Sequence, residues 1–189
     1  MNPLILLISF SPWILFGIIA GHSLLSLEIA LGVSLLTSFI VGFKDLKKKM
    51  IVSWATITFF IIACLLVIVF QVYAIIPFLG IGSNIVLTLI AFGSLVAGLP
   101  FTMQYARQEV PRDRWDNPEF IRINQVLTAG WGVLFLFGLF NSLMDMIQPG
   151  FLGIIGDASM YITIIIGIIF TVTYPPYAKK RYAERKANQ

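Results

Sequence analysis

The chain has 189 residues, of which 58% are hydrophobic and 12% are charged, and its mean hydropathy is +0.91. Soluble domains carry about a quarter charged residues and slightly under half apolar ones. So large an apolar excess cannot be buried inside a domain of 21.1 kDa, which excludes an ordinary soluble protein and predicts one that is solvated by lipid. The single cysteine, Cys64, excludes a disulfide framework within one chain and a Cys-rich metal site.

Six apolar runs are long enough to cross a bilayer, because a transmembrane helix needs about 17–25 such residues. Lipid-exposed backbone must satisfy its own hydrogen bonds, so each run is predicted to be a helix. The alternating segments of an outer-membrane barrel are absent from the sequence. We therefore predict a single all-α domain over residues 1–189, a polytopic bundle of six transmembrane helices. The spans are expected near residues 4–20, 25–43, 51–71, 83–103, 120–143 and 158–176.

The distribution of Lys and Arg predicts the orientation of the bundle. Six crossings put the N-terminus, residues 44–49, residues 104–119 and the C-terminal tail on one side of the membrane. All thirteen Lys and Arg residues then lie on that side or at its helix ends. Because cytoplasmic loops carry the excess of basic residues, both termini are predicted to be cytoplasmic. The opposite side receives residues 21–24, 72–82 and 144–157.

The first external turn and the second span contain two residues of interest. His22 is the only histidine in the chain, and a lone histidine without a partner ligand is weak support for a haem site. Ser26 is predicted to cap the second helix, which would place Glu28 in its first turn, where the helix dipole favours a carboxylate. The alternative interpretation makes Glu28 an intramembrane group that handles protons or ions.

The segment "RQEVPRDRWDNPEF", residues 107–120, gathers charge in an otherwise apolar chain. With Arg122 it holds eight of the 22 Asp, Glu, Lys and Arg residues. One interpretation is a topology determinant that lies on anionic lipid headgroups. The other is a docking surface for a cytoplasmic or membrane protein, which the mixture of four Arg with two Glu and two Asp favours. The candidate docking residues are Arg107, Arg112, Arg114, Trp115 and Arg122.

The end of this segment predicts a helix start. Asn117 can cap the helix, Pro118 is favoured at the first helical position, and Glu119 complements the positive end of the dipole. Trp115 and Tyr105 are expected at the level of the lipid headgroups, where aromatic side chains are enriched in membrane proteins.

The fifth span carries a distinctive face. At about 100° per residue, five of its side chains fall within an arc of about 60°, and Asn141 lies roughly 90° from the centre of that arc. Small residues admit a neighbouring helix, aromatic rings fill gaps and an amide can hydrogen-bond across, so we predict that this face packs into the bundle centre. Ile123, Val126, Leu134 and Leu136 are expected mainly elsewhere. The residues of the face are Asn124, Trp131, Phe135, Gly138 and Ser142.

The sixth span and the tail complete the chain. "GDASMY" predicts a capped helix start at Asp157; if the span instead began at Phe151, Asp157 would lie well inside the membrane and become a functional candidate. Residues 177–189 form a basic cytoplasmic tail that contains "KKRYAERK". Such a tail is expected to lie on anionic lipid headgroups, at roughly 1 kcal/mol per charge.

Residues for catalysis are scarce. The one histidine and the one cysteine lie at different predicted depths, so no nucleophile, base and acid can assemble. The sequence contains no phosphate-binding glycine loop, no metal-ligand spacing and no nucleic-acid motif. We therefore expect no enzyme activity, no cofactor and no nucleic-acid partner.

Two stretches resemble a known family. "GLPFTMQYARQEVP" and "FIRINQVLTAGWGVLFLFGLFNS" are similar to the second half of intracellular septation protein A-like membrane proteins, with Trp131, Phe135, Gly138 and Asn141 at the positions of a W-x3-F-x2-G-x2-N pattern. "FKDLKKKMIVSWATITFF" resembles the basic loop of that family, so the similarity covers roughly residues 40–145. The longer mixed-charge loop departs from the family. The resemblance implies an inner-membrane protein of cell-envelope maintenance or division, without known catalysis.

Three functional hypotheses follow. The first is a non-enzymatic scaffold or accessory subunit that acts through protein and lipid contacts. The second is a small proton-coupled or solute transporter that uses Glu28 or Asp157. The third is a cofactor-binding subunit of a larger membrane complex, for which His22 is the obvious ligand.

Overall fold

The computed structural model of the protein describes residues 3–21 and 23–187, and every regular element within them is a helix. The expected all-α class is therefore confirmed. The long helices are α1 (Pro3–Ile19), α2 (Leu24–Lys47), α3 (Ile51–Cys64), α4 (Leu79–Val96), α6 (Pro118–Ile147) and α8 (Ser159–Ala187). The short ones are the π-helical η1 (Leu65–Val69), the 3-10 helices η2 (Tyr73–Phe78) and η3 (Arg112–Arg114), α5 (Phe101–Ala106) and α7 (Ile154–Asp157).

Five helical stretches are long and apolar enough to cross a membrane, as expected for a multi-pass membrane protein. The remaining expected span, residues 4–20, corresponds to α1, which is apolar but shorter, with 17 residues. The five long stretches are Leu24–Lys47, Ile51–Val69, Tyr73–Val96, Pro118–Ile147 and Ser159–Arg185.

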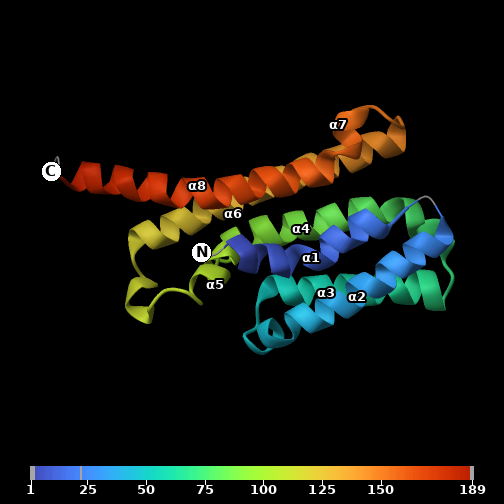
Figure 1. The fold of residues 1–189 in the computed structure, drawn as a ribbon, viewed down its shortest axis with the longest axis horizontal. Helices are drawn as coiled ribbons and strands as arrows, with labels where there is room; N and C mark the ends of the chain where they lie inside the picture. Colours follow the sequence, from blue (N-terminus) through green and yellow to red (C-terminus); the bar gives the residue numbers. More distant parts are fainter. Residues whose placement is uncertain (1–2, 22, 188–189) are drawn as a thin grey trace.

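The helices lie side by side in an elongated bundle of three layers (Figure 1). α6 and α8 form one outer layer, α1 and α4 the middle, and α2 and α3 the other outer layer. The start of α1 and the end of α8 lie at the same end of the bundle, together with the segments that carry Lys and Arg, residues 44–49, 107–122 and 179–186. We call this the basic end. The end of α1, the start of α2 and the connections around residues 70–78 and 147–158 lie at the opposite end.

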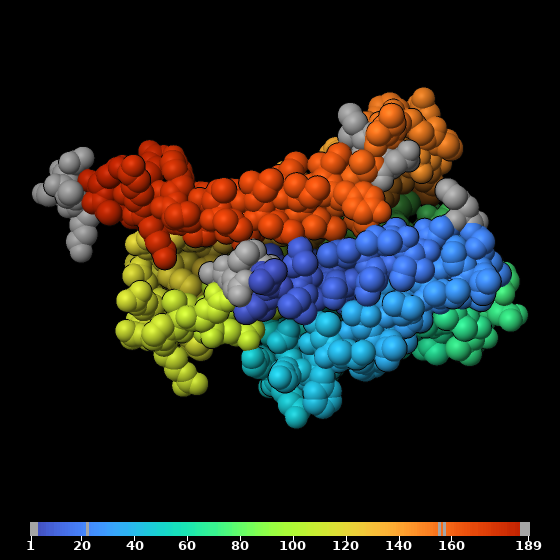
Figure 2. All heavy atoms as spheres, in the orientation of Figure 1, coloured from blue at the N-terminus to red at the C-terminus, as the bar shows by residue number. Residues whose placement is uncertain are grey.

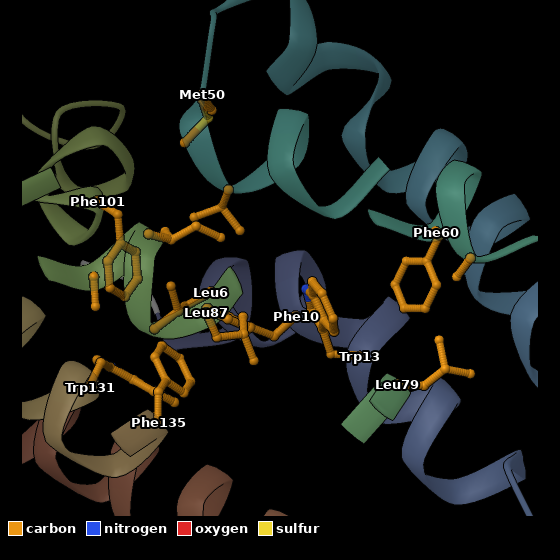
Figure 3. Packing of buried hydrophobic residues seen from close by; sticks show 14 of the residues in the cluster. Leu6, Phe10, Trp13, Met50, Phe60, Leu79, Leu87, Phe101, Trp131 and Phe135 are labelled. Carbon is orange, nitrogen blue, oxygen red and sulfur yellow. The ribbon is translucent and has the colours of Figure 1, made fainter. Parts of the chain in front are cut away.

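The centre of the bundle is packed with aromatic side chains of α1 (Figure 3). Phe10 stacks on Trp131 of α6, with ring centroids 5.5 Å apart and planes 6° from parallel. Trp13 donates its indole N–H to Thr56 Oγ1 of α3 at 2.9 Å, and it is also in ring contact with Phe60. A buried indole N–H needs an acceptor, and Thr56 provides one inside the apolar core. α1 therefore joins the α3 side of the bundle to the α6 side.

The expected fourth span, residues 83–103, is wrong at both ends. The helical stretch begins at Tyr73, and α4 ends at Val96. Gly98 has a φ of +72°, its N–H donates to Leu95, and the next N–H, of Leu99, donates to the Ser94 carbonyl at 3.0 Å. This is the Schellman arrangement, in which a glycine in the left-handed conformation ends the helix. Ser94 Oγ then accepts the N–H of Phe101 at 3.0 Å, so the chain starts α5 without an unpaired amide at that point.

Other helix boundaries divide between confirmation and correction. Asn117 caps α6 by accepting the Glu119 N–H at 2.8 Å, with Pro118 in the first position, as predicted. The predicted cap at Ser26 is wrong, because α2 begins at Leu24 and its cap is Ser23, whose hydroxyl accepts the Ser26 N–H at 3.1 Å. α8 passes through two adjacent prolines and continues to residue 187, so the basic tail is mostly helix.

Candidate functional site

The loop between α5 and α6 is organised around Trp115. Its indole N–H donates to the Val110 carbonyl at 3.1 Å. The guanidinium of Arg107 lies 4.9 Å from the ring centroid and that of Arg112 lies 5.7 Å from it. Cations at such distances are attracted by the electron-rich face of the ring. Arg107 and Arg112, two of the five candidate docking residues, therefore hold a third, Trp115, in place. These contacts give the loop a defined shape.

α5 fixes the start of this loop to α6. Thr102 Oγ1 donates to the Asn124 carbonyl at 2.9 Å and lies 2.8 Å from Thr128 Oγ1, and both threonines are fully buried. Since the proton of Thr102 is used for the carbonyl, Thr128 must donate to Thr102. Tyr105, expected among the lipid headgroups, is buried in the core instead, and this burial raises the pKa of its phenol.

A cavity of about 840 Å³ lies at the basic end, where the loop, the start of α6 and the extension of α8 meet. Figure 1 shows this extension running past the rest of the bundle, alongside the start of α6. The floor of the cavity is apolar and includes Ala106, Ile123 and Leu127, all of which are buried. Pro175 and Tyr182 of α8 form part of the opposite wall. Two regions that are distant in the sequence, the loop with the start of α6 and the extension of α8, thus build one concave site.

The rim of this cavity carries charges of both signs. Arg114 comes from the loop, and Lys179 and Arg185 come from α8. Glu109 and Glu119 lie on the same lining. The rim therefore combines acidic and basic side chains, as the sequence of the loop does, and two of its three basic side chains come from the tail.

Asn124 adds a buried polar group to the lining. Its Nδ2 donates to the Phe120 carbonyl at 2.8 Å, one turn earlier in α6. Its Oδ1 has no hydrogen-bond partner within residues 3–21 and 23–187, although the side chain exposes only 2% of its surface. A buried acceptor without a donor is costly, by about 1–3 kcal/mol, so this oxygen is suited to a donor from a bound molecule.

The remaining candidate residue of the loop region, Arg122, lies apart from the cavity. It is exposed on α6 and is not part of the lining. Of the five candidate docking residues, only Arg114 lines the cavity itself. Sequence reasoning missed the contribution of α8, because nothing in a local pattern shows that Lys179 and Arg185 reach the loop.

The face predicted for the fifth span lies within the bundle. Trp131 and Phe135 expose 3% of their surfaces each. Gly138 packs against the side chain of Asn84 on α4, and Ser142 Oγ accepts the Asn84 amide at 3.1 Å. Ile123, expected on a different face, is nevertheless buried beside Ala178 of α8. α6 therefore lies between α4 and α8 and buries two faces.

Asn141 joins α6 to the α7–α8 corner. Its Nδ2 donates to the Gly156 carbonyl at 3.2 Å and to Ser159 Oγ at 3.1 Å. The side chain of the neighbouring Asp157 is not among the described ones, so its capping role stays a prediction. The helix of the sixth span begins at Ser159 rather than at Phe151.

The other two candidates for chemistry come from the first external turn and the second span of the sequence. Glu28 is half-buried in the second turn of α2, not in the first turn as expected, because the helix begins earlier. His22 lies outside the described residues. Among those that are described, no cluster of three or more His, Cys, Asp and Glu side chains is placed to hold a metal ion.

Comparisons with protein-family models, with curated proteins and with solved structures find no match to this chain.

Proposed function

We propose that the chain is a non-enzymatic membrane protein that acts as a scaffold or accessory subunit, and that the cavity at its basic end receives a cytoplasmic segment of a partner protein. In this proposal α1 is a sixth crossing and the basic end faces the cytoplasm. The positions of the basic segments support this orientation, because Lys and Arg are retained on the cytoplasmic side.

The observation that carries the proposal is the build of the cavity. An apolar floor beneath a charged rim is the usual anatomy of a protein–protein interface, in which a desolvated centre is surrounded by polar groups. The unpaired Asn124 Oδ1 is suited to a backbone N–H of an extended segment. Such a segment would place an apolar side chain over Ile123 and Leu127 while its own charges meet the rim.

The rim favours a protein over a lipid headgroup. Glu109 and Glu119 share the lining with the three cations, and their carboxylates would repel a phosphate. Lys180 and Arg181 lie on α8, are exposed and do not line the cavity. These residues are better placed for the anionic lipid surface, to which basic segments are attracted.

The resemblance to septation protein A-like proteins supports a role in cell-envelope maintenance or division at the inner membrane. Its motif residues all make packing contacts: Trp131 and Phe135 lie in the core, Gly138 contacts α4 and Asn141 binds the α7–α8 corner. The shared pattern therefore describes how the bundle is held together. The mixed-charge loop, which departs from the family, is what would make the docking specific to this chain.

Charge reversal at paired positions tests the docking site. The intact protein is purified from native membranes with its partners, which are identified by mass spectrometry. Lys179→Glu and Arg114→Glu change the rim, whereas Lys180→Glu and Arg122→Glu make the same change at exposed residues outside the cavity. We expect the first two variants to lose the partner and the second two to keep it. Equal retention by all four variants would overturn the docking proposal.

The orientation has a separate test. Reporter tags at the two termini should both report the cytoplasm, and a tag within residues 144–157 should report the opposite side. Termini on opposite sides would exclude six crossings.

A further inference from the structure

A second cavity, of about 240 Å³, lies among α1, α4, α6 and α8, away from the basic end. Much of its wall consists of core side chains, including Leu6, Phe10, Leu87 and Phe135, which Figure 3 shows close together. Figure 2 views the molecule from the side on which α1 and α8 are neighbours, and part of α4 is visible between them near the end that carries α7. The cavity therefore lies behind the junction of α1 and α8, within the apolar part of the bundle.

The junction of α1 and α8 offers a route from the surrounding lipid. Met160 packs on Gly17 and closes the junction at one point. Further along, Leu7 of α1 lines the cavity although 36% of its surface is exposed, and Ile164 of α8 lines it while half-buried. Side chains that line the cavity and are also exposed on the outer surface of the bundle mark an opening of the cavity. Because the outer surfaces of both helices are apolar, the opening leads to lipid chains rather than to water.

The polar groups of the cavity gather toward the end of the bundle opposite the basic end. Asn84 and Ser142 meet there in a hydrogen bond of 3.1 Å, and Ser159 lies at the first position of α8. All three are within about two turns of a helical end, which places them near the depth of lipid ester groups if the helices cross the bilayer. None of the described residues that line the cavity carries a formal charge.

Thr163 independently indicates that the cavity can bind a hydrogen-bonding ligand. It lines the cavity, exposes only 8% of its surface, and its hydroxyl has no hydrogen-bond partner among the described residues. A threonine in a helix normally bonds to a carbonyl of the preceding turn. Leaving a buried hydroxyl unpaired is costly, and water is poorly suited to a site whose walls are mostly apolar.

We infer that this cavity holds the apolar chain of a bilayer amphiphile, with a neutral hydrogen-bonding group of that molecule (a hydroxyl or an ester) at Thr163 and beside Asn84, Ser142 and Ser159. The apolar walls receive the chain, and the polar groups select an uncharged group over a phosphate, which no cation of the lining could neutralise. The site is distinct from the cavity at the basic end and does not depend on the proposed docking function.

Photolabelling of the full-length protein tests the site. The protein is reconstituted in phosphatidylcholine vesicles that contain a small fraction of phosphatidylcholine with a photoreactive acyl chain. A second arm uses unlabelled vesicles with a photoreactive long-chain alcohol. Labelled residues are located by mass spectrometry. We expect labelling of cavity residues of α1 and α8 in at least one arm, and the arm that labels identifies the source as a diacyl lipid or a free single-chain amphiphile. No cavity labelling in either arm would overturn the inference.

Two adjacent isoleucines provide a matched pair of variants. Ile164 lines the cavity and Ile165, which is 57% exposed, does not. Ile164→Trp fills the cavity and should reduce cavity labelling by about fivefold or more, since overpacking by a large side chain is unfavourable. Ile165→Trp should leave it unchanged, and both should leave labelling of the exposed Ile169 unchanged. Equal cavity labelling in the two variants would also overturn the inference.

A substitution of Thr163 by valine, which has nearly the same shape, tests the role of the Thr163 hydroxyl. Thr163→Val removes the unpaired donor and should reduce cavity labelling by roughly two- to tenfold, the value of one hydrogen bond. Thr173→Val is the control, because Thr173 is exposed and donates to the Ile169 carbonyl of its own helix at 2.8 Å. This variant keeps the test valid even if Ile164→Trp fails to fold. Unchanged labelling in Thr163→Val would exclude hydrogen bonding at this position.

Discussion

The indole ring of Trp131, on α6, packs directly on the backbone of α8 at Gly167. A Cβ atom at position 167 would overlap the ring at Cη2, Cζ2 and Cζ3. The same indole donates its N–H to Thr171 Oγ1 at 3.1 Å, one turn further along α8, and stacks on Phe10 of α1. Because Trp131 is held on three sides, it cannot move away from a larger residue at 167. Because Gly167 has no side chain, the backbone of α8 can approach the ring of Trp131 closely, and this contact holds α8 to α6.

Gly167→Ala should therefore destabilise the bundle by about 1–3 kcal/mol through overpacking against a rigid ring. Gly93→Ala is the matched control, since a Cβ at position 93 of α4 would meet no atom within 4 Å. That change should be neutral or stabilising by roughly 0.5–1 kcal/mol, because glycine is unfavourable inside a helix. Thermal unfolding in detergent compares the two. Similar melting temperatures would show that the Trp131 contact is not tight.

Gly138→Leu tests a second position on the same face of α6 as Trp131. A side chain at position 138 would displace Asn84 and break its hydrogen bond to Ser142, so we expect a loss of about 1–3 kcal/mol. Leu134→Ala should cost less, because Leu134 is only partly buried at the edge of the core. The measurement is again thermal unfolding in detergent. If both variants melt at the same temperature, the contact between α4 and α6 matters less than the predicted face implies.

The fifth span illustrates what helical periodicity can predict. Trp131, Phe135 and Gly138 share an arc and all three line the cavity inside the bundle, and that arc is visible in the sequence. Ile123 looks like any lipid-facing residue, yet it is buried against α8. In lipid an apolar side chain is equally suited to a neighbouring helix and to an acyl chain. The pattern therefore identifies a face with small and polar residues, but it does not show how many helices surround α6.

Trp115→Ala should loosen the loop at the basic end. The change removes two cation–π contacts and the hydrogen bond to the Val110 carbonyl. Trypsin should then cut after Arg112 or Arg114 roughly tenfold faster, because cleavage follows the local opening of the segment. The melting temperature should change little, since the loop lies outside the core. Trp115→Phe, which keeps a ring but loses the N–H, should be intermediate. An unchanged cleavage rate in Trp115→Ala would show that the tryptophan does not order the loop.

The boundary between α4 and α5 and the basic cavity differ in how far the sequence reveals them. "AGLP", residues 97–100, combines a glycine after the last helical turn with a proline two residues later, the common signature of a helix end. This signature predicts that the helix of the fourth span ends at Val96, as the structure shows. The cavity has no such signature. It requires α8 to remain helical past residue 176 and to pass the loop, and this depends on tertiary packing.

The buried threonine pair between α5 and α6 gives the last prediction. Thr102 donates to the Asn124 carbonyl and accepts from Thr128, so Thr102→Val removes both hydrogen bonds, whereas Thr128→Val leaves the bond to the carbonyl intact. We expect Thr102→Val to cost about 1–3 kcal/mol and Thr128→Val about 0.5–1.5 kcal/mol. The double variant should cost less than the sum, because both single changes remove the same hydrogen bond. Unfolding of the four proteins in detergent measures this coupling. Strictly additive losses would show that the two hydroxyls do not interact.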